Sequence, residues 1–96
     1  MAAYVIFGSV SVSPEEMEGY GEKAIASVAA YDGKLVAATN DIDAREGDWH
    51  PERIVIIEFP TMAKAQGWYD SPEYQEVLPL RLKANRDKMV IVPGKE

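Results

Sequence analysis

Short apolar runs rich in β-branched residues predict four strands along the chain. These runs cover residues 3–12, 35–39, 53–59 and 88–92, and turn-forming residues separate them. Between the second and third strands, residues 40–52 are polar and rich in turn formers, which predicts a long loop or an irregular hairpin tip.

Apolar residues at steps of three and four predict helices between the strands. The first helix begins after Ser13, a good N-cap, and ends at Gly33, a residue free to adopt a positive φ. Two further helices begin after Thr61 and at residues 70–73, each behind a side chain that can cap it. Because Pro79 has no backbone N–H, we expect it to kink the last helix or to divide it into two pieces.

The order of the predicted elements is strand, helix, two strands, a helical segment and a final strand. This is the split βαβ pattern of ferredoxin-like folds, in which the first and third strands are central. The sequence therefore predicts a single α+β domain over residues 1–96. We expect a βαββαβ sandwich, in which helices cover one face of a four-stranded antiparallel sheet.

The third strand is apolar on both of its faces. Ile54 and Ile56 point to one side, and Val55, Ile57 and Phe59 point to the other. An antiparallel sheet with water on its second face normally alternates apolar and polar residues, so something should cover that face. A second copy of the sheet in a two-fold homodimer is the simplest cover. The alternative is a monomer whose long loop folds across the sheet.

Four segments resemble the signature segments of the family called domain of unknown function 1330. They are Ala3-Tyr4-Val5, Glu46-Gly47-Asp48-Trp49-His50-Pro51-Glu52-Arg53, Glu58-Phe59-Pro60 and Trp68-Tyr69-Asp70-Ser71-Pro72-Glu73-Tyr74-Gln75. The resemblance implies a dimeric α/β barrel, built from two ferredoxin-like protomers whose sheets pack together. Relatives in that superfamily include cofactor-free monooxygenases, lactone isomerases and haem-handling proteins, but the family itself has no established reaction.

The chain departs from the family pattern at two places. It has Asp32-Gly33 where the family often has paired glycines, and Pro60-Thr61 where the family commonly has Pro-Ser. Each substitute keeps the local property, as a turn residue and as a helix cap respectively.

Composition removes several classes of function. The net charge of −6 and the lack of a basic stripe argue against nucleic-acid binding, because phosphate neutralisation dominates that affinity. Without cysteine there is no disulfide, thiolate nucleophile or cysteine zinc site. No apolar run is long enough to span a membrane, and the first residues lack the basic start of a signal peptide. We expect a cytoplasmic protein without a cofactor.

Glu58 and His50 are the candidate catalytic residues. Glu58 lies near the end of a central strand, where burial would raise its pKa into the range useful to a general base. The alternative makes Glu58 an ordinary acid paired with Arg53, Arg81 or a backbone amide. His50 follows Glu46 and Asp48 at alternate positions in the loop, but we expect a solvated histidine or an acid–base group at a pocket rim, not a metal ligand.

The candidate ligand-binding residues surround the last helices. They are Trp68, Tyr69, Ser71, Tyr74, Arg53 and Arg81. The aromatic rings are placed to line a cleft beside Glu58, and Arg81 to hold a carboxylate. The alternatives make the rings core or dimer contacts and Ser71 a helix cap. We therefore expect a small-molecule pocket between sheet and helices, used for proton transfer or cofactor-free oxygenation. A non-catalytic binding or assembly module is the alternative.

Overall fold

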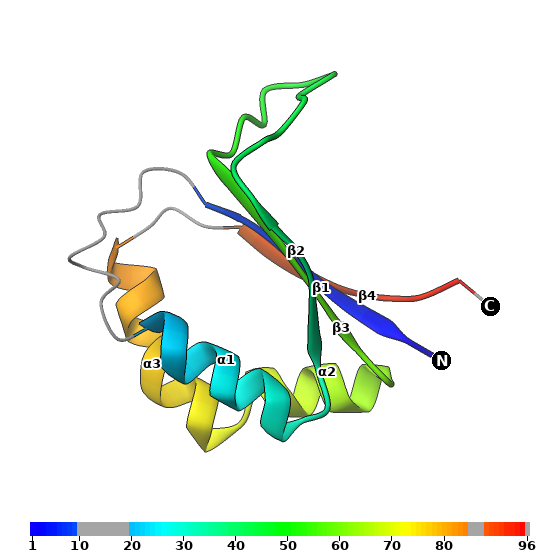
Figure 1. Cartoon of the computed structure of the whole chain (residues 1–96), viewed down its shortest axis with the longest axis vertical. Helices are drawn as coiled ribbons and strands as arrows, with labels where there is room; N and C mark the ends of the chain where they lie inside the picture. The colour runs from blue at the N-terminus through cyan, green and yellow to red at the C-terminus, as the bar shows by residue number, and fades with distance from the viewer. Residues whose placement is uncertain (10–19, 85–87, 96) are drawn as a thin grey trace.

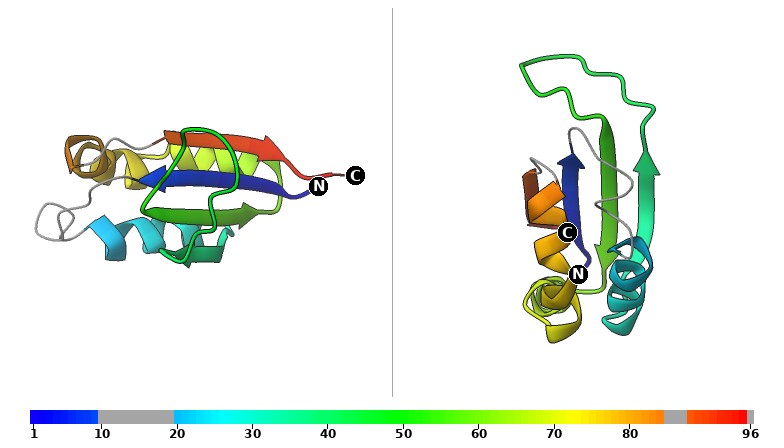
Figure 2. Two further views of the ribbon diagram at one scale, coloured as in Figure 1. Left: turned by 90° about the horizontal axis from the view of Figure 1, so that it is seen from above. Right: turned by 90° about the vertical axis from the view of Figure 1, so that its left-hand side faces the viewer.

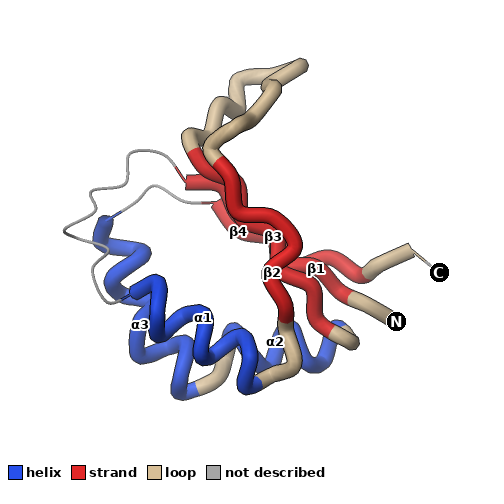
Figure 3. Tube along the Cα trace, viewed as in Figure 1, coloured by secondary structure: helices blue, strands red, loops and turns tan. Residues whose placement is uncertain are grey.

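The computed structural model describes residues 1–9, 20–84 and 88–95, and for residues 20, 21 and 80–84 it describes the backbone alone. Within these ranges the elements are β1 (Ala3–Ser9), α1 (Tyr20–Ala30), β2 (Lys34–Thr39), β3 (Arg53–Phe59), α2 (Met62–Tyr69), α3 (Pro72–Ala84) and β4 (Lys88–Pro93). The strands form one layer, and the helices lie together on one side of it (Figures 1 and 3). This is the predicted α+β arrangement.

The four strands form one antiparallel sheet in the order β2-β3-β1-β4. The first and third strands of the chain are therefore central, as predicted. β3 has the predicted limits, whereas β2 begins one residue earlier than predicted and contains an irregularity between Leu35 and Ala37. The predicted strand residues 10–12 and the helix start at Ser13 lie outside the described residues.

The two later helices begin at the predicted caps. The Lys64 N–H donates to the Thr61 hydroxyl oxygen at 3.1 Å, and the Tyr74 N–H donates to the Ser71 hydroxyl oxygen at 3.1 Å. Pro79 does not divide the last helix, because α3 is assigned as a single helix that includes it. Proline removes one backbone hydrogen bond, and the turns on either side of it keep theirs.

The turn after α1 differs from the prediction, because Asp32 and not Gly33 takes the left-handed conformation. Asp32 has φ 64°, and its N–H and that of Gly33 donate to the carbonyls of Ala29 and Val28. Gly33 is needed for a different reason, because a side chain at this position would not fit. A Cβ at this position would lie 2.6 Å from the Phe59 ring and 2.7 Å from Val28. The glycine therefore allows the turn after α1 to pack closely against the core.

The core between the sheet and the helices is centred on Trp68 of α2. Its ring centroid lies 4.2 Å from that of Tyr74 and 5.5 Å from that of Phe59, and all three side chains are buried. The Trp68 indole N–H donates to the Ser27 hydroxyl at 3.0 Å, so its polar atom is satisfied inside the core. Val5 of β1 is also fully buried in this cluster.

None of the helices in the described ranges lies on the second face of the sheet, and we call this face the open face (Figure 2). Residues 40–52 form a loop between β2 and β3 that projects beyond the end of the sheet (Figures 1 and 2). Part of this loop returns to the open face. A Cβ at Gly8 would lie 2.8 Å from the Trp49 ring and 3.0 Å from Pro51. The loop thus covers one end of this face and leaves Trp49 46% exposed.

Candidate functional site

The residues of the open face lie in rungs, which are sets of residues directly opposite one another on neighbouring strands. The middle rung contains Val90, Ile6, Ile56 and Ala37, one from each strand. All four are apolar, and Val90 is 55% exposed. The centre of the open face is therefore an apolar strip that crosses the whole sheet.

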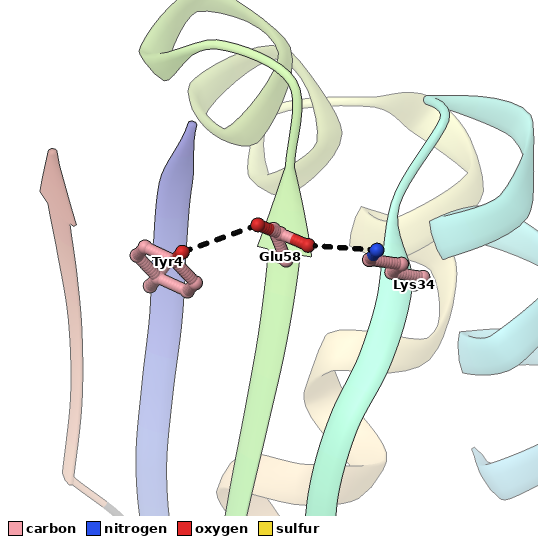
Figure 4. Close-up of polar contacts among 3 residues, drawn as sticks. All are labelled: Tyr4, Lys34 and Glu58. Carbon is pink, nitrogen blue, oxygen red and sulfur yellow. Dashed lines mark hydrogen bonds and ion pairs between the residues drawn. The ribbon is translucent and has the colours of Figure 1, made fainter. Parts of the chain in front are cut away.

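The next rung, nearer the end of β3, has three polar side chains beside one valine, and we call it the polar rung. It contains Val92, Tyr4, Glu58 and Lys34. Glu58 lies between two partners (Figure 4): the Tyr4 hydroxyl donates to Oε2 at 3.1 Å, and Lys34 Nζ lies 3.1 Å from Oε1. The Glu58 side chain is 25% exposed and that of Lys34 is 74% exposed. The carboxylate is thus held between a hydroxyl and a largely exposed ammonium group.

The pKa of Glu58 moves in the opposite direction to the one expected from its sequence position. The hydrogen bond from Lys34 lowers this pKa most, the one from Tyr4 lowers it further, and burial has a weaker opposing effect. In turn, the hydrogen bond to Glu58 raises the pKa of Tyr4 above its ordinary value. The predicted raised pKa of Glu58 was wrong because partners that stabilise the charged form outweigh desolvation.

A shallow concavity lies beside the polar rung. Its volume is about 240 Å³, and it is lined by Ala2, Asp32, Lys34, Glu58, Phe59 and Pro60. Typical ligand sites begin at about 300 Å³, so this concavity suits only a small ligand or part of one. Its wall combines an apolar part with two carboxylates and one ammonium group.

The predicted aromatic lining lies on the other face of the sheet from Glu58. Trp68 and Tyr74 belong to the core beneath the helix-covered face, and Tyr69 packs partly buried against both. Ser71 is buried and caps α3, while its hydroxyl also donates to the Trp68 carbonyl at 2.6 Å. The structure does not bring these residues together with Glu58. Ligand binding by them stays a prediction.

Two further predicted site residues, Arg53 and His50, lie apart from Glu58. Arg53 is at the opposite end of β3, where it donates to the Asn40 side-chain oxygen at 2.7 Å. His50 is exposed in the loop that follows β2. Arg81 lies in α3, but its side chain falls outside the described part of the chain. Glu58 is thus a paired acid, as in the alternative interpretation, but its partners are Lys34 and Tyr4, and Arg53 is too far along β3 to be one.

Tyr4 and Lys34 are the two site residues that the sequence did not reveal. Tyr4 was expected in the first strand, and Lys34 lies just before the predicted start of the second at residue 35. Contact with Glu58 depends on the register of β1 and β2 against β3. A shift of one residue would turn either side chain to the other face. The described residues contain no cluster of three or more histidine and acidic side chains that could hold a metal ion. In the same residues, no helix is long and apolar enough to cross a membrane.

Solved structures with the same fold cover almost the whole chain. A protein of unknown function from Rhodopseudomonas palustris has a TM-score of 0.76 at 16% identity, over 99% of this chain and 83% of that one. SnoaB, a cofactor-independent oxygenase from Streptomyces nogalater, has a TM-score of 0.65 at 16% identity, over 99% and 93%. A dimeric ferredoxin-like protein of unknown function from Bacteroides fragilis has a TM-score of 0.57 at 13% identity, over 97% and 95%.

These similarities establish the fold as ferredoxin-like and, at such low identity, nothing more specific. Comparison with proteins of curated function gives no match. The sequence profile of one family matches residues 2–95, which is nearly the whole chain, and the segments that resemble this family in the sequence all lie within the matched range. The chain belongs to the family described as a domain of unknown function, DUF1330.

Proposed function

We propose that this protein works as a homodimer in which the open faces of two sheets pack together to form an α/β barrel, and that this dimer binds a small molecule. The observation that carries the dimer is the middle rung, whose side chains Val90, Ile6, Ile56 and Ala37 are all apolar. A sheet face that meets water normally carries polar side chains at such positions. The apolar strip therefore favours an open face that is covered in the working protein.

A second copy of the chain is the cover that fits best. The chain's own loop reaches only the end of the face near Gly8, through Trp49 and Pro51. A two-fold dimer brings identical surfaces together, so an apolar strip would meet an apolar strip. The protein of the same fold from Bacteroides fragilis is described as dimeric, which supports a dimer. The exposed half of Trp49 would add to the contact area.

Analytical ultracentrifugation tests the dimer. We expect the wild type to sediment at about twice the chain mass of 10.6 kDa at micromolar concentration. The variant Val90→Glu places a charge in the middle rung at a residue 55% exposed in one chain, so it should yield a folded monomer. Ile25→Glu is the control, because Ile25 is 63% exposed on α1, away from the open face. A monomeric wild type, or a Val90→Glu variant that remains dimeric, would refute the proposed interface.

The polar rung and its concavity support small-molecule binding more than catalysis. A lowered pKa makes Glu58 a weaker base at neutral pH, although it keeps the carboxylate charged and fit to anchor a ligand. The structural similarity to a cofactor-independent oxygenase favours a second candidate function, proton transfer or oxygenation without a cofactor, with Glu58 or His50 as the base. Binding and catalysis can be distinguished by identifying a ligand that copurifies with the protein, incubating it with the protein in air and analysing the mixture for product. Conversion by the wild type but not by Glu58→Gln would support catalysis.

A further inference from the structure

We propose that in the dimer the loop of residues 40–52 from each chain lies against the polar rung of the other chain, so that the partner's Trp49 and the partner's His50 complete the site at Glu58. This proposal rests on the proposed function and adds which part of the second copy meets the site. In one chain the candidate residues Glu58 and His50 lie apart. Glu58 is near the end of β3, and His50 belongs to the loop that precedes β3. A second copy can bring them together.

The loop makes the two ends of the open face different. The Glu52 N–H donates to the Ser9 carbonyl at 2.8 Å and Pro51 is buried, so the returning part of the loop is fixed against the end of β1. Trp49 lies over Gly8 at this end, which we call the loop end. The loop rises on the side of the sheet away from the helices (Figure 1). The polar rung lies towards the other end, the polar end, where the two chain termini leave the sheet (Figure 2).

The space between two packed sheets favours opposite ends in contact. Sheets that pack face to face lie about 10 Å apart. At the loop end, Trp49 and Pro51 already lie on the sheet over Gly8 and take up this space. If two copies packed with their loop ends together, loop would meet loop and the middle rungs would be held apart. If each loop end packs on the partner's polar end, each loop has room and the two middle rungs can meet.

The charge of the loop favours the same arrangement. Residues 40–52 contain five acidic residues and one arginine, and that arginine is paired with Asp43 at 2.9 Å. Two such loops at one end would bring their acids together, and like charges side by side in an interface cost free energy. At the polar end, the Lys34 ammonium group offsets the charge of Glu58 at 3.1 Å, so an acidic loop meets a paired carboxylate there.

The polar end has what a second chain's loop could contact. Val92 of the polar rung is 36% exposed and Trp49 is 46% exposed, so the partner's Trp49 can bury apolar surface against it. The concavity beside Glu58 is shallow in one chain, at about 240 Å³. A wall supplied by the partner's loop would enclose it and bring it closer to the size of an ordinary ligand site. The site is therefore completed only when two chains meet.

Crosslinking tests the arrangement, because the chain contains no cysteine and engineered thiols have no background. His50→Cys and Lys34→Cys are unfolded together, refolded so that mixed dimers form, and treated with a short bismaleimide. We expect a covalent dimer with one chain of each kind, identified by mass spectrometry of the joined peptides. Ile25→Cys refolded with Lys34→Cys is the control and should give none, because Ile25 lies on α1.

Two outcomes of the crosslinking would overturn the proposal. In the first, His50→Cys alone crosslinks to itself, which places loop against loop. In the second, the mixture of His50→Cys and Lys34→Cys gives no more covalent dimer than the Ile25→Cys control.

Amide NMR signals of Trp49→Ala provide a second readout, because an aromatic ring shifts the signals of the residues it lies against. In the dimer, this variant should shift the signals of Tyr4 and Val92 in the polar rung as well as those around Gly8. Combined with Val90→Glu, which should yield a monomer, it should shift only the signals around Gly8. Unshifted signals of Tyr4 and Val92 in the dimer would overturn the proposal.

Sedimentation of the same samples separates this proposal from the proposed dimer. A dimeric wild type in which His50→Cys crosslinks to itself keeps the dimer and refutes only the arrangement of its two chains. A monomeric wild type refutes the dimer itself.

Discussion

The two faces of the sheet carry similar apolar side chains but differ in what covers them. On the helix-covered face, Val5, Ile57 and Phe59 are buried beneath α2 and α3. On the open face, Ile6 and Ile56 remain partly exposed, and Val90 is more than half exposed. One face is therefore covered by the chain's own helices, whereas we propose that a second copy of the chain covers the other. Substitutions should reveal this difference in stability on one face and in assembly on the other.

The largest effect is expected at Trp68, the centre of the helix-covered face. Trp68→Ala would leave a cavity next to Phe59 and Tyr74 and remove the hydrogen bond to Ser27. We expect the free energy of unfolding to fall by about 3–5 kcal/mol, measured by urea denaturation. In a domain of this size that loss is a large part of the total stability.

Trp49→Ala is the matched substitution on the open face. Its ring is 46% exposed, so the loss of stability within one chain should be about half of that at Trp68, or less. If Trp49→Ala destabilised the protein as much as Trp68→Ala, the two faces would not differ as described.

Two glycines provide a smaller comparison of the same kind. Gly33→Ala brings a methyl group against the packed Phe59 ring and should cost about 1–3 kcal/mol. Gly8→Ala meets Trp49 on the open face, where a partly exposed ring can shift more easily. We therefore expect a smaller cost at Gly8 and a change in Trp49 fluorescence. Equal melting temperatures of the two variants would contradict this expectation.

The smallest effect is the pH dependence of the polar rung. Because the folded protein holds the pKa of Glu58 below its ordinary value of 4.5, the carboxylate contributes stability above that pH. This contribution is lost as the pH falls through the lowered pKa. The difference in stability between wild type and Glu58→Gln should therefore be present at neutral pH and shrink in acid.

The origin of that pKa can be measured directly by NMR titration of the Glu58 carboxyl carbon. Lys34→Met should raise the pKa towards its ordinary value more than Tyr4→Phe does, because Lys34 has the larger effect. The opposite order, or a wild-type pKa above 4.5, would show that burial dominates.

Much of the fold follows from local patterns in the sequence. The limits of β3, the caps at Thr61 and Ser71 and the central position of β1 and β3 were all predicted, because each depends on neighbouring residues or on a common topology. Pro79 does not divide the helix, which tolerates the one lost backbone hydrogen bond, and the kink that was the other expectation stays a prediction.

The contacts of the candidate site could not be predicted from local sequence patterns, because they depend on strand register and helix packing. The sequence identified Glu58 as an acid on the face of Ile54 and Ile56. It did not place Trp68 and Tyr74 on the opposite face, since that requires the packing direction of α2 and α3. Contacts among Tyr4, Lys34 and Glu58 join residues far apart in the chain.

By itself, the sequence determined the elements, their order and the apolar character of both faces of the central strand, since these follow from short-range periodicity. Only the tertiary structure decided which partners surround Glu58 and hence that its pKa is lowered, because strand register sets which side chains meet. It likewise decided that the long loop covers one end of the open face and leaves the middle rung bare. The sequence predicted an apolar strand on both faces of the sheet, and the structure shows that on the open face this strand is part of an apolar strip of four residues.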